Sequence, residues 1–258
     1  MLKYMSSTAN NKYAVRVSYM GTNYSGWQRQ SDTESIQQSI EESLLKLGEN
    51  CTVTGAGRTD AGVHAISQIA SFRTKGNWET GKLLLAMNAH LPLDIRIMDV
   101  FSVDESFDAR RSALWREYRY FIYHGSSCLA PLRPFVWWNR FFWDLEQVRI
   151  ACRLITGRHD FRAFCKAAEC PDNSIRTLLR VSCKRIGRMT MLQVRGEAFL
   201  NNMVRIIVGN LDRVGRGEVT SEWMRELLSG VNRIESGMTA PSSGLFFWRV
   251  GYPMGGIK

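Results

Sequence analysis

The sequence contains no apolar run that approaches the roughly 20 residues a membrane-spanning helix needs. Residues 1–11 carry a single lysine and no apolar stretch of the kind found in signal peptides. None of the six cysteines forms a Cys-x-x-Cys pair, and no histidine is spaced to complete a zinc site. Scattered cysteines without an export signal are typical of reduced thiols in the cytosol. We therefore expect a cytoplasmic protein with no membrane segment, no disulfide and no metal.

Lysine is scarce in the second part of the chain, where arginine is abundant. Residues 110–258 hold 24 basic and 12 acidic side chains, and only three of the basic ones are lysine. Residues 1–109 hold 10 basic and 12 acidic side chains, so the formal net charge of +10 comes entirely from the later part. Arginine presents a planar fork that matches phosphate oxygens and stacks on bases. A surface kept basic for solubility would be served equally well by lysine, so the bias favours a nucleic-acid partner.

Residues 55–65 read G-A-G-R-T-D-A-G-V-H-A and form the most distinctive run of the chain. Glycine permits backbone conformations and close approaches that a Cβ would prevent. Asp60 lies on this crowded loop next to a cation, which suggests a functional site. The alternative is an ordinary turn in which Asp60 bonds its own backbone, but such a turn rarely needs Gly55, Gly57 and Gly62 together.

This run resembles the signature of the TruA family of tRNA pseudouridine synthases, in which the aspartate is catalytic. The match carries that role to Asp60. Segments similar to the family extend in order from about Tyr13 to Tyr252, nearly the whole chain. They are Gly26-Trp27-Gln28, Phe107-Asp108-Ala109-Arg110, Tyr118-Arg119-Tyr120, Met203-Val204-Arg205, and Ala240-Pro241 with Gly244-Leu245.

The resemblance implies that uridine is isomerised to pseudouridine in the anticodon arm of tRNA, at positions 38, 39 and/or 40. The reaction breaks the N1–C1′ bond, turns the base and joins C5 to C1′, so it needs neither a cofactor nor a metal. It does need a carboxylate on one face of the nucleotide, a pocket for the detached uracil and an acceptor for the C5 proton.

The resemblance also assigns roles to five residues. Asp60 is expected to be the essential carboxylate, with Arg58 and Arg205 as the cations beside it, because a nearby cation favours an ionised carboxyl group. Tyr118 is expected to stack on the flipped uracil, and its hydroxyl is a candidate acceptor for the C5 proton. Leu245 is expected to form an apolar wall of the pocket. Without the family context, Tyr118 and Leu245 would be read as core residues.

Three further predictions concern residues near the motifs. Thr59 is expected to tie the catalytic loop by a side-chain hydrogen bond and to border the substrate. Gln28 and Arg29 are candidates for contacts with the RNA, although loop residues on the surface would look the same. His64 is expected to be a structural hydrogen-bonding residue, since a lone histidine more often has that role than a catalytic one.

Two segments depart from the family pattern. Residues 201–202 are both asparagine, where many relatives carry histidine, so no imidazole acts there. Residues 165–174 have a sequence of their own, which leaves their part in RNA recognition open. Neither departure touches the expected catalytic residues, and we therefore expect an active enzyme.

The hydrophobic periodicity divides the chain into two halves after a disordered tail, residues 1–11. In residues 12–109 we expect a strand at 15–19, a helix at 36–47, strands at 52–54 and 65–72, a helix at 78–88 and a strand at 95–103. Ser35 opens the first helix as the start of a capping box, and Gly48 closes it. In residues 110–253 we expect a strand at 118–122, a helix at 145–155, strands at 178–185 and 191–199, helices at 203–214 and 222–228, and a strand at 245–250. Segments 124–143 and 160–176 lack any period and are expected to be loops.

Each half thus follows the order β-α-β-β-α-β, which predicts an α+β protein of two ferredoxin-like units. The resemblance implies that the units share one mostly antiparallel sheet with a catalytic cleft between them, and that the protein is a homodimer. Five of the aromatic residues in the first loop could stack on bases, although we favour a core or dimer contact for most of them. They are Trp137, Trp138, Phe141, Phe142 and Trp143.

Two other functions compete with a synthase. A non-catalytic RNA-binding protein or RNA chaperone could keep the same scaffold, but it would not need Asp60 and Tyr118. A nucleotide-binding enzyme could use the glycines of residues 55–62 to hold phosphates. That run matches neither phosphate-binding glycine motif, and the carboxylate within it would repel phosphate.

Overall fold

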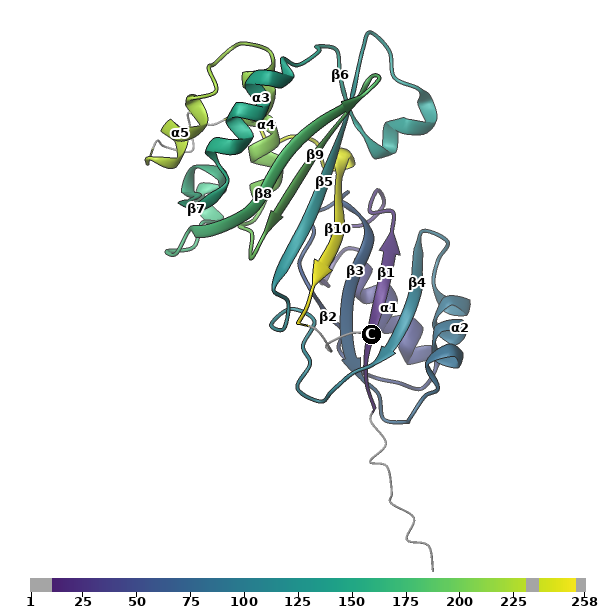
Figure 1. The fold of residues 1–258 in the computed structure, drawn as a ribbon. Helices are drawn as coiled ribbons and strands as arrows, with labels where there is room; N and C mark the ends of the chain where they lie inside the picture. The colour runs from purple at the N-terminus through teal and green to yellow at the C-terminus, as the bar shows by residue number, and fades with distance from the viewer. Residues whose placement is uncertain (1–10, 231–236, 254–258) are drawn as a thin grey trace, which may run out of the picture.

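A single mixed sheet runs through the whole molecule (Figure 1). In the computed structural model, which describes residues 11–230 and 237–253, ten strands belong to this sheet. The strand order is β4-β1-β3-β10-β5-β9-β8-β7, with β2 paired to β3 and β6 paired to β5. All pairs are antiparallel except β3 with β10 and β5 with β6. The predicted α+β architecture with a mostly antiparallel sheet is confirmed.

The first half contains four strands and two helices in the predicted order. They are β1 (Lys12–Tyr19), α1 (Ile36–Lys46), β2 (Thr54–Gly55), β3 (His64–Arg73), α2 (Thr80–His90) and β4 (Ile95–Ser102). The Ser35 hydroxyl accepts a hydrogen bond from the Gln38 amide at 3.3 Å and so caps α1, and Gly48 follows that helix with a φ of +83°. The strand predicted at 52–54 is reduced to two residues, and α2 begins two residues later than predicted.

The second half repeats that order and adds short elements to it. Its main elements are β5 (Trp115–His124), α3 (Leu145–Leu154), β8 (Ile175–Ile186), β9 (Met189–Gly196), α4 (Met203–Gly215), α5 (Trp223–Leu228) and β10 (Leu245–Gly251). The two predicted loops contain structure. Loop 124–143 holds a 3₁₀ turn at Ala130–Phe135 and the strand β6 (Trp137–Asn139). Loop 160–176 holds 3₁₀ turns at Arg162–Phe164 and Ala167–Glu169; the unpredicted strand β7 (Gly157–Asp160) leads into it, and β8 begins at its end. Helix α4 also continues through Gly215, where we expected it to end, and Gly217 takes the positive φ beyond it.

The two halves use the same strand order, which the sequence did not reveal. In each half the last strand lies beside the first, and the third and second strands follow. This order is β4-β1-β3-β2 in the first half and, apart from the short β6 and β7, β10-β5-β9-β8 in the second. Strand β10 joins the halves through two parallel register pairs, Phe246 with His64 and Phe247 with Ala65. Because β2 is so short, it pairs only with Ala70 and Ser71 of β3. The start of β3 is therefore left for β10.

The predicted boundary at residues 109–110 falls in the segment between β4 and β5. Most of the predicted tail lies outside the described residues. Asn11 is described, and its side-chain amide donates to the Thr74 carbonyl at 2.7 Å.

The two faces of β5 differ in chemistry because alternate residues point to opposite sides of a strand. On one face Tyr118 and Tyr120 are buried. On the other face Glu117 is fully buried and its carboxylate pairs with three guanidinium groups. They belong to Arg195 at 2.6 Å, Arg249 at 3.1 Å and Arg119 at 3.3 Å. Each of these arginines therefore has an acidic partner within the protein.

The five aromatic residues that we considered for base stacking differ in how exposed they are. Trp143 is buried, whereas Trp137 and Trp138 are half-buried. Phe141 and Phe142 remain more than half exposed, at 57% and 54%. Core packing thus accounts for Trp143 and partly for the two other tryptophans, and it does not account for the two phenylalanines.

Candidate active site

The glycine-rich loop connects β2 to β3 and carries Asp60 at its tip. Main-chain hydrogen bonds hold it against the segment that follows β1. The Trp27 amide donates to the Thr59 carbonyl at 3.0 Å, and the Gly62 amide donates to the Tyr24 carbonyl at 3.2 Å. The loop therefore has a defined conformation before any substrate arrives.

At two positions of this loop the local geometry favours glycine over any residue with a Cβ. Gly62 has a φ of +78°, and a Cβ there would lie 2.5 Å from the Ser242 hydroxyl oxygen. A Cβ on Gly57 would lie 3.1 Å from the Phe247 ring and 3.5 Å from the Tyr118 hydroxyl. Glycine at these positions lets the loop pass close to residues of the second half.

The predicted side-chain tie of Thr59 is present in the structure. Its hydroxyl lies 2.9 Å from the hydroxyl of Tyr19, which also accepts from the Gln68 amide at 3.3 Å. All three residues are buried. The position of Thr59, and with it the backbone next to Asp60, is thus fixed from strands β1 and β3.

Asp60 forms an ion pair with Arg205 from the start of α4. Arg205 Nη1 lies 3.1 Å from Asp60 Oδ2, and both side chains are largely shielded, with 18% and 24% exposed respectively. Arg205 Nε donates to the Ala240 carbonyl at 2.7 Å, and Nη1 also donates to Asn202 Oδ1 at 2.9 Å. Three acceptors therefore fix the guanidinium group next to the carboxylate.

Arg58 is placed differently from what the sequence led us to expect. It borders the same cavity as Asp60, but its side chain is exposed. Across residues 11–230 and 237–253, no ion pair or hydrogen bond joins Arg58 to Asp60. Of the two expected cations, only Arg205 contacts the carboxylate.

Tyr118 and Leu245 come from the paired strands β5 and β10 and are both nearly buried, at 7% and 5% exposed. The Tyr118 ring stands edge-on to Phe199 and Phe247, with centroids 5.0 and 5.2 Å away. Burial raises the pKa of Tyr118, the negative charge of Asp60 raises it further, and the charge of Arg116 acts in the opposite direction. The phenol is therefore protonated in the free protein.

A cavity of about 870 Å³ connects these groups. Its lining includes Asp60, Arg58 and Thr59 from the first half and Tyr118, Arg205 and Leu245 from the second. Such a volume is in the range of small-molecule and cofactor sites. Six of the predicted site residues thus surround one opening, at the junction of the two halves.

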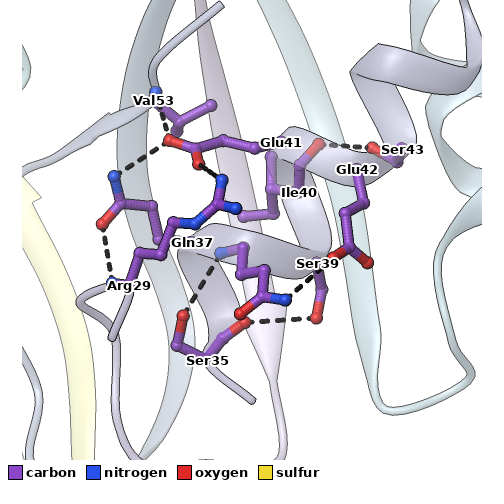
Figure 2. Close-up of polar contacts among 10 residues, drawn as sticks. Arg29, Ser35, Gln37, Ser39, Ile40, Glu41, Glu42, Ser43 and Val53 are labelled. Carbon is purple, nitrogen blue, oxygen red and sulfur yellow. Dashed lines mark hydrogen bonds and ion pairs between the residues drawn. The ribbon is translucent and has the colours of Figure 1, made fainter. Parts of the chain in front are cut away.

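Gln28 and Arg29 do not border this cavity. Gln28 is exposed, and the Arg29 guanidinium pairs with Glu41 of α1 at 3.1 Å (Figure 2). The Arg29 amide also donates to Gln37 Oε1 at 3.0 Å, and Glu41 in turn accepts from the Val53 amide. These contacts hold the chain against the start of α1, so the structure gives Arg29 a local role.

Sequence reasoning missed several residues of the cavity, above all Arg116. Its guanidinium group donates to the carbonyls of Ala56 at 3.0 Å and Glu197 at 2.8 Å. It also donates to the carbonyls of Arg110 and Ala113. It therefore connects the Asp60 loop with the second half. A signal was available, because Arg116 stands two positions before Tyr118 and so shares its face of β5.

His64 has the structural role expected for it. It is buried, accepts from the Gly21 amide through Nδ1 at 3.2 Å, and has Nε2 2.9 Å from the Pro134 carbonyl. Burial lowers the pKa of His64, so the ring is neutral at pH 7. Its ring also stacks on Phe246, which places it at the junction between β3 and β10.

Other classes of site are not found in the described part of the chain. No group of three or more histidine, cysteine or acidic residues there is arranged to hold a metal ion. None of the helices between residues 11 and 230 or 237 and 253 has the length and apolarity to cross a membrane.

Comparison with known proteins identifies the family. The model of a family described as tRNA pseudouridine synthase matches residues 15–110 and 151–253. The tRNA pseudouridine synthase A of Agrobacterium fabrum is 38% identical over 247 residues, which cover 94% of this chain and 92% of the relative. The chain belongs to the TruA family of tRNA pseudouridine synthases. Its predicted class, an isomerase that acts on tRNA, is confirmed by this membership.

Two other TruA proteins align with this chain over a similar share of their length. The enzyme of Colwellia psychrerythraea is 38% identical over 244 residues, or 94% of each chain, and that of Francisella tularensis is 36% identical over 243 residues, or 93% of this chain and 94% of the relative. Among solved structures, the archaeal box H/ACA sRNP Nop10–Cbf5 complex aligns with a TM-score of 0.38 and 11% identity. That alignment covers 80% of this chain and 45% of that one, and it is too distant to bear on function.

Proposed function

We propose that this protein isomerises uridine to pseudouridine in the anticodon arm of tRNA, with Asp60 as the essential carboxylate. The observation that carries the proposal is the position of Asp60: it is paired with Arg205 in a cavity that Tyr118 and Leu245 also border. Membership of the TruA family supplies the reaction. The target uridine has to leave its stack to reach such a cavity, as in other enzymes that act on bases.

The reaction is an internal rearrangement whose atoms balance without a second substrate. The N1–C1′ bond breaks, the uracil turns and the C5–C1′ bond forms. The proton lost from C5 is matched by a proton gained at N1. Asp60 acts on the nucleotide as a carboxylate, either as nucleophile or by assisting loss of a proton, and Arg205 holds it in that orientation.

Tyr118 has two tasks in this proposal. Its ring and the Leu245 side chain hold the detached uracil, and its hydroxyl takes part in removing the C5 proton. Burial is the main cause of the raised pKa of Tyr118 in the free protein, and the Asp60 charge raises that pKa further. Any step that neutralises the Asp60 carboxylate removes this effect, so the Tyr118 hydroxyl becomes easier to ionise at the stage when the C5 proton must leave.

The finer features of the substrate and the assembly are proposals as well. We propose modification on the 3′ side of the anticodon stem-loop, at positions 38, 39 and/or 40, by a homodimer in the cytoplasm. The family resemblance supports each of these. The excess of arginine in residues 110–258 favours binding of tRNA through shape and phosphate rather than base edges.

The decisive experiment maps pseudouridine in an unmodified tRNA transcript after incubation with the wild-type protein or with Asp60→Ala and Asp60→Asn. We expect the wild type to modify the anticodon arm, and both variants to bind tRNA normally without forming pseudouridine. Binding by the wild type without any modification would favour the alternative, a non-catalytic RNA-binding protein. Modification by either variant would remove Asp60 from the reaction.

A further inference from the structure

Six arginines border the catalytic cavity, and they differ in how their charge is balanced. They are Arg58, Arg110, Arg111, Arg116, Arg176 and Arg205. Arg205 is paired with Asp60, but within the described residues the other five form no ion pair. On the opposite face of the sheet, the Glu117 carboxylate is shared by Arg119, Arg195 and Arg249. Five arginines without an acidic partner in the described ranges thus border the opening through which the substrate must enter, and the acidic residues of that lining are Asp60 and Glu169.

Arg110 and Arg111 are presented by a turn just before β5. Asp108 Oδ1 accepts from the main-chain amides of both residues, at 2.9 and 2.7 Å. Its carboxylate therefore bonds to their backbone and leaves their guanidinium groups without an acidic partner. Both side chains are exposed at the cavity rim. The turn is further tied down because the Arg110 carbonyl accepts from Arg116.

Arg176 lies on β8, at the end of the sheet where β5 begins and β9 ends. Register places Arg116 opposite Gly196 and Gly196 opposite Leu178, two residues beyond Arg176. Arg176 Nη1 donates to the carbonyls of Asn173 at 2.9 Å and Ile175 at 2.7 Å. These bonds hold the guanidinium group in place without neutralising it.

A second, smaller cavity of about 240 Å³ continues from the first along Arg176. Arg158 of β7 borders it, and Arg176 and Ala198 border both cavities. The buried Nε of Arg176 has no hydrogen-bond partner. Glu197 is the acidic residue of this smaller lining, so positive charge predominates there as well.

Arg116 differs from these rim residues because its donors are used within the protein. Nε, Nη1 and Nη2 all donate to main-chain carbonyls. It adds positive charge to the cavity but positions the catalytic loop rather than contacting a ligand.

We propose that Arg110 and Arg111 on one side, and Arg176 on the other, bind the phosphates of the RNA backbone next to the flipped uridine. Arg158 extends the second contact along the smaller cavity. The fork of each guanidinium group matches phosphate oxygens. The main chain of Arg110 and Arg111 is already fixed by Asp108, and the Arg176 guanidinium is already held by two carbonyls, so binding a phosphate requires little further ordering there. This inference rests on the proposed function, since it takes the cavity to hold the uridine.

The test uses a double variant that carries both Arg110→Gln and Arg111→Gln, and a single variant, Arg176→Gln. The control is a second double variant, with Arg153→Gln and Arg225→Gln, which removes two exposed arginines outside the cavity. Affinity for a tRNA transcript and for its isolated anticodon stem-loop is measured across a salt series. Removal of one phosphate-binding side chain lowers the slope of log K against log salt by about 0.7 to 0.9. We expect the rim double variant to lower the slope by about 1.5 and Arg176→Gln by about half as much. The reduction should be the same for the stem-loop, and Arg176→Lys should recover part of it.

Slopes that match the control, or a reduction confined to full-length tRNA, would overturn the inference, because the rim would then not bind phosphates near the target. Single-turnover pseudouridine formation by the wild type is recorded in parallel. If the rim variants flatten the slope but the wild type forms no pseudouridine, the phosphate contacts stand and the proposed function fails.

Discussion

Arg205 Nη1 lies 3.1 Å from Asp60 Oδ2, although 145 positions separate the two residues in the chain. Asp60 comes from the β2–β3 loop of the first half and Arg205 from the start of α4 in the second. The pair therefore exists only when the two halves are assembled around β3 and β10. In the proposed function, the chemistry therefore depends on a contact that only the assembled fold can form.

Replacement of Arg205 by lysine should slow pseudouridine formation about 10- to 100-fold. Lysine keeps the charge but cannot bond Asp60, Asn202 and the Ala240 carbonyl in the same planar geometry, and a hydrogen bond to a charged group is worth about 1.5 to 3 kcal/mol. Single-turnover assays at saturating enzyme measure the effect. Arg213→Lys, on the same helix but paired with Glu218, is the matched control. Equal rates for the two variants would contradict the role of Arg205.

Tyr118→Phe should retain tRNA binding and lose about 10²- to 10⁴-fold in rate, as expected for removal of a group that takes part in proton transfer. A substrate carrying deuterium at C5 of uridine separates this step from the others. We expect a larger isotope effect in the variant than in the wild type, because loss of the C5 proton becomes limiting. Tyr120→Phe is the control: its hydroxyl donates to the Pro241 carbonyl at 2.7 Å, so its loss should reduce stability but leave the isotope effect unchanged.

Arg116→Met should affect both stability and rate, since its guanidinium group donates to four carbonyls from the two halves. We expect the free energy of unfolding to fall by about 2 to 3 kcal/mol, because four carbonyls lose a charged donor and one of them belongs to the buried Ala56. Urea unfolding measures this loss, and the catalytic rate is compared at a temperature where both proteins are folded. An unchanged rate in folded protein would mean that Arg116 does not position the catalytic loop.

Glu117→Gln should destabilise the protein at pH 7 by about 2 kcal/mol, because three partly exposed guanidinium groups lose the fully buried carboxylate that pairs with them. Burial raises the pKa of Glu117, but the hydrogen bonds from Arg195, Gln193 and Arg249 outweigh it, so the pKa lies below its usual value. A carboxyl group with a lowered pKa contributes stability above the ordinary glutamate pKa of about 4.3, and this is lost as pH falls further.

The difference in unfolding free energy between wild type and Glu117→Gln should therefore be largest at neutral pH and shrink below about pH 4. Urea unfolding at pH 7 and at a pH below 4 provides the comparison. A difference that stays constant over this range would show that the Glu117 carboxylate does not supply the stability assigned to it.

Local patterns in the sequence were sufficient to predict most elements of the fold. The alternation of β1 and the helical spacing after Ser35 depend on residues a few positions apart, so they can be seen without the tertiary structure. The same holds for the loop of Asp60, whose glycines indicate close packing before its neighbours are known. Short pieces such as β2, β6 and β7 were mispredicted or missed, because two to four residues are too few to show a period.

The sequence by itself indicated a carboxylate site on a glycine-rich loop and, through the excess of arginine in residues 110–258, a nucleic-acid partner. The resemblance of its motifs to the TruA family supplied the reaction. Only the tertiary structure decided which arginine serves the carboxylate. Arg58, two positions from Asp60, is exposed, whereas Arg205 is in contact with it. The physical reason is that an irregular loop has no repeating geometry, so the directions of two side chains only two positions apart cannot be read from their spacing. Contacts between distant residues follow from strand order and helix packing, which no local pattern encodes.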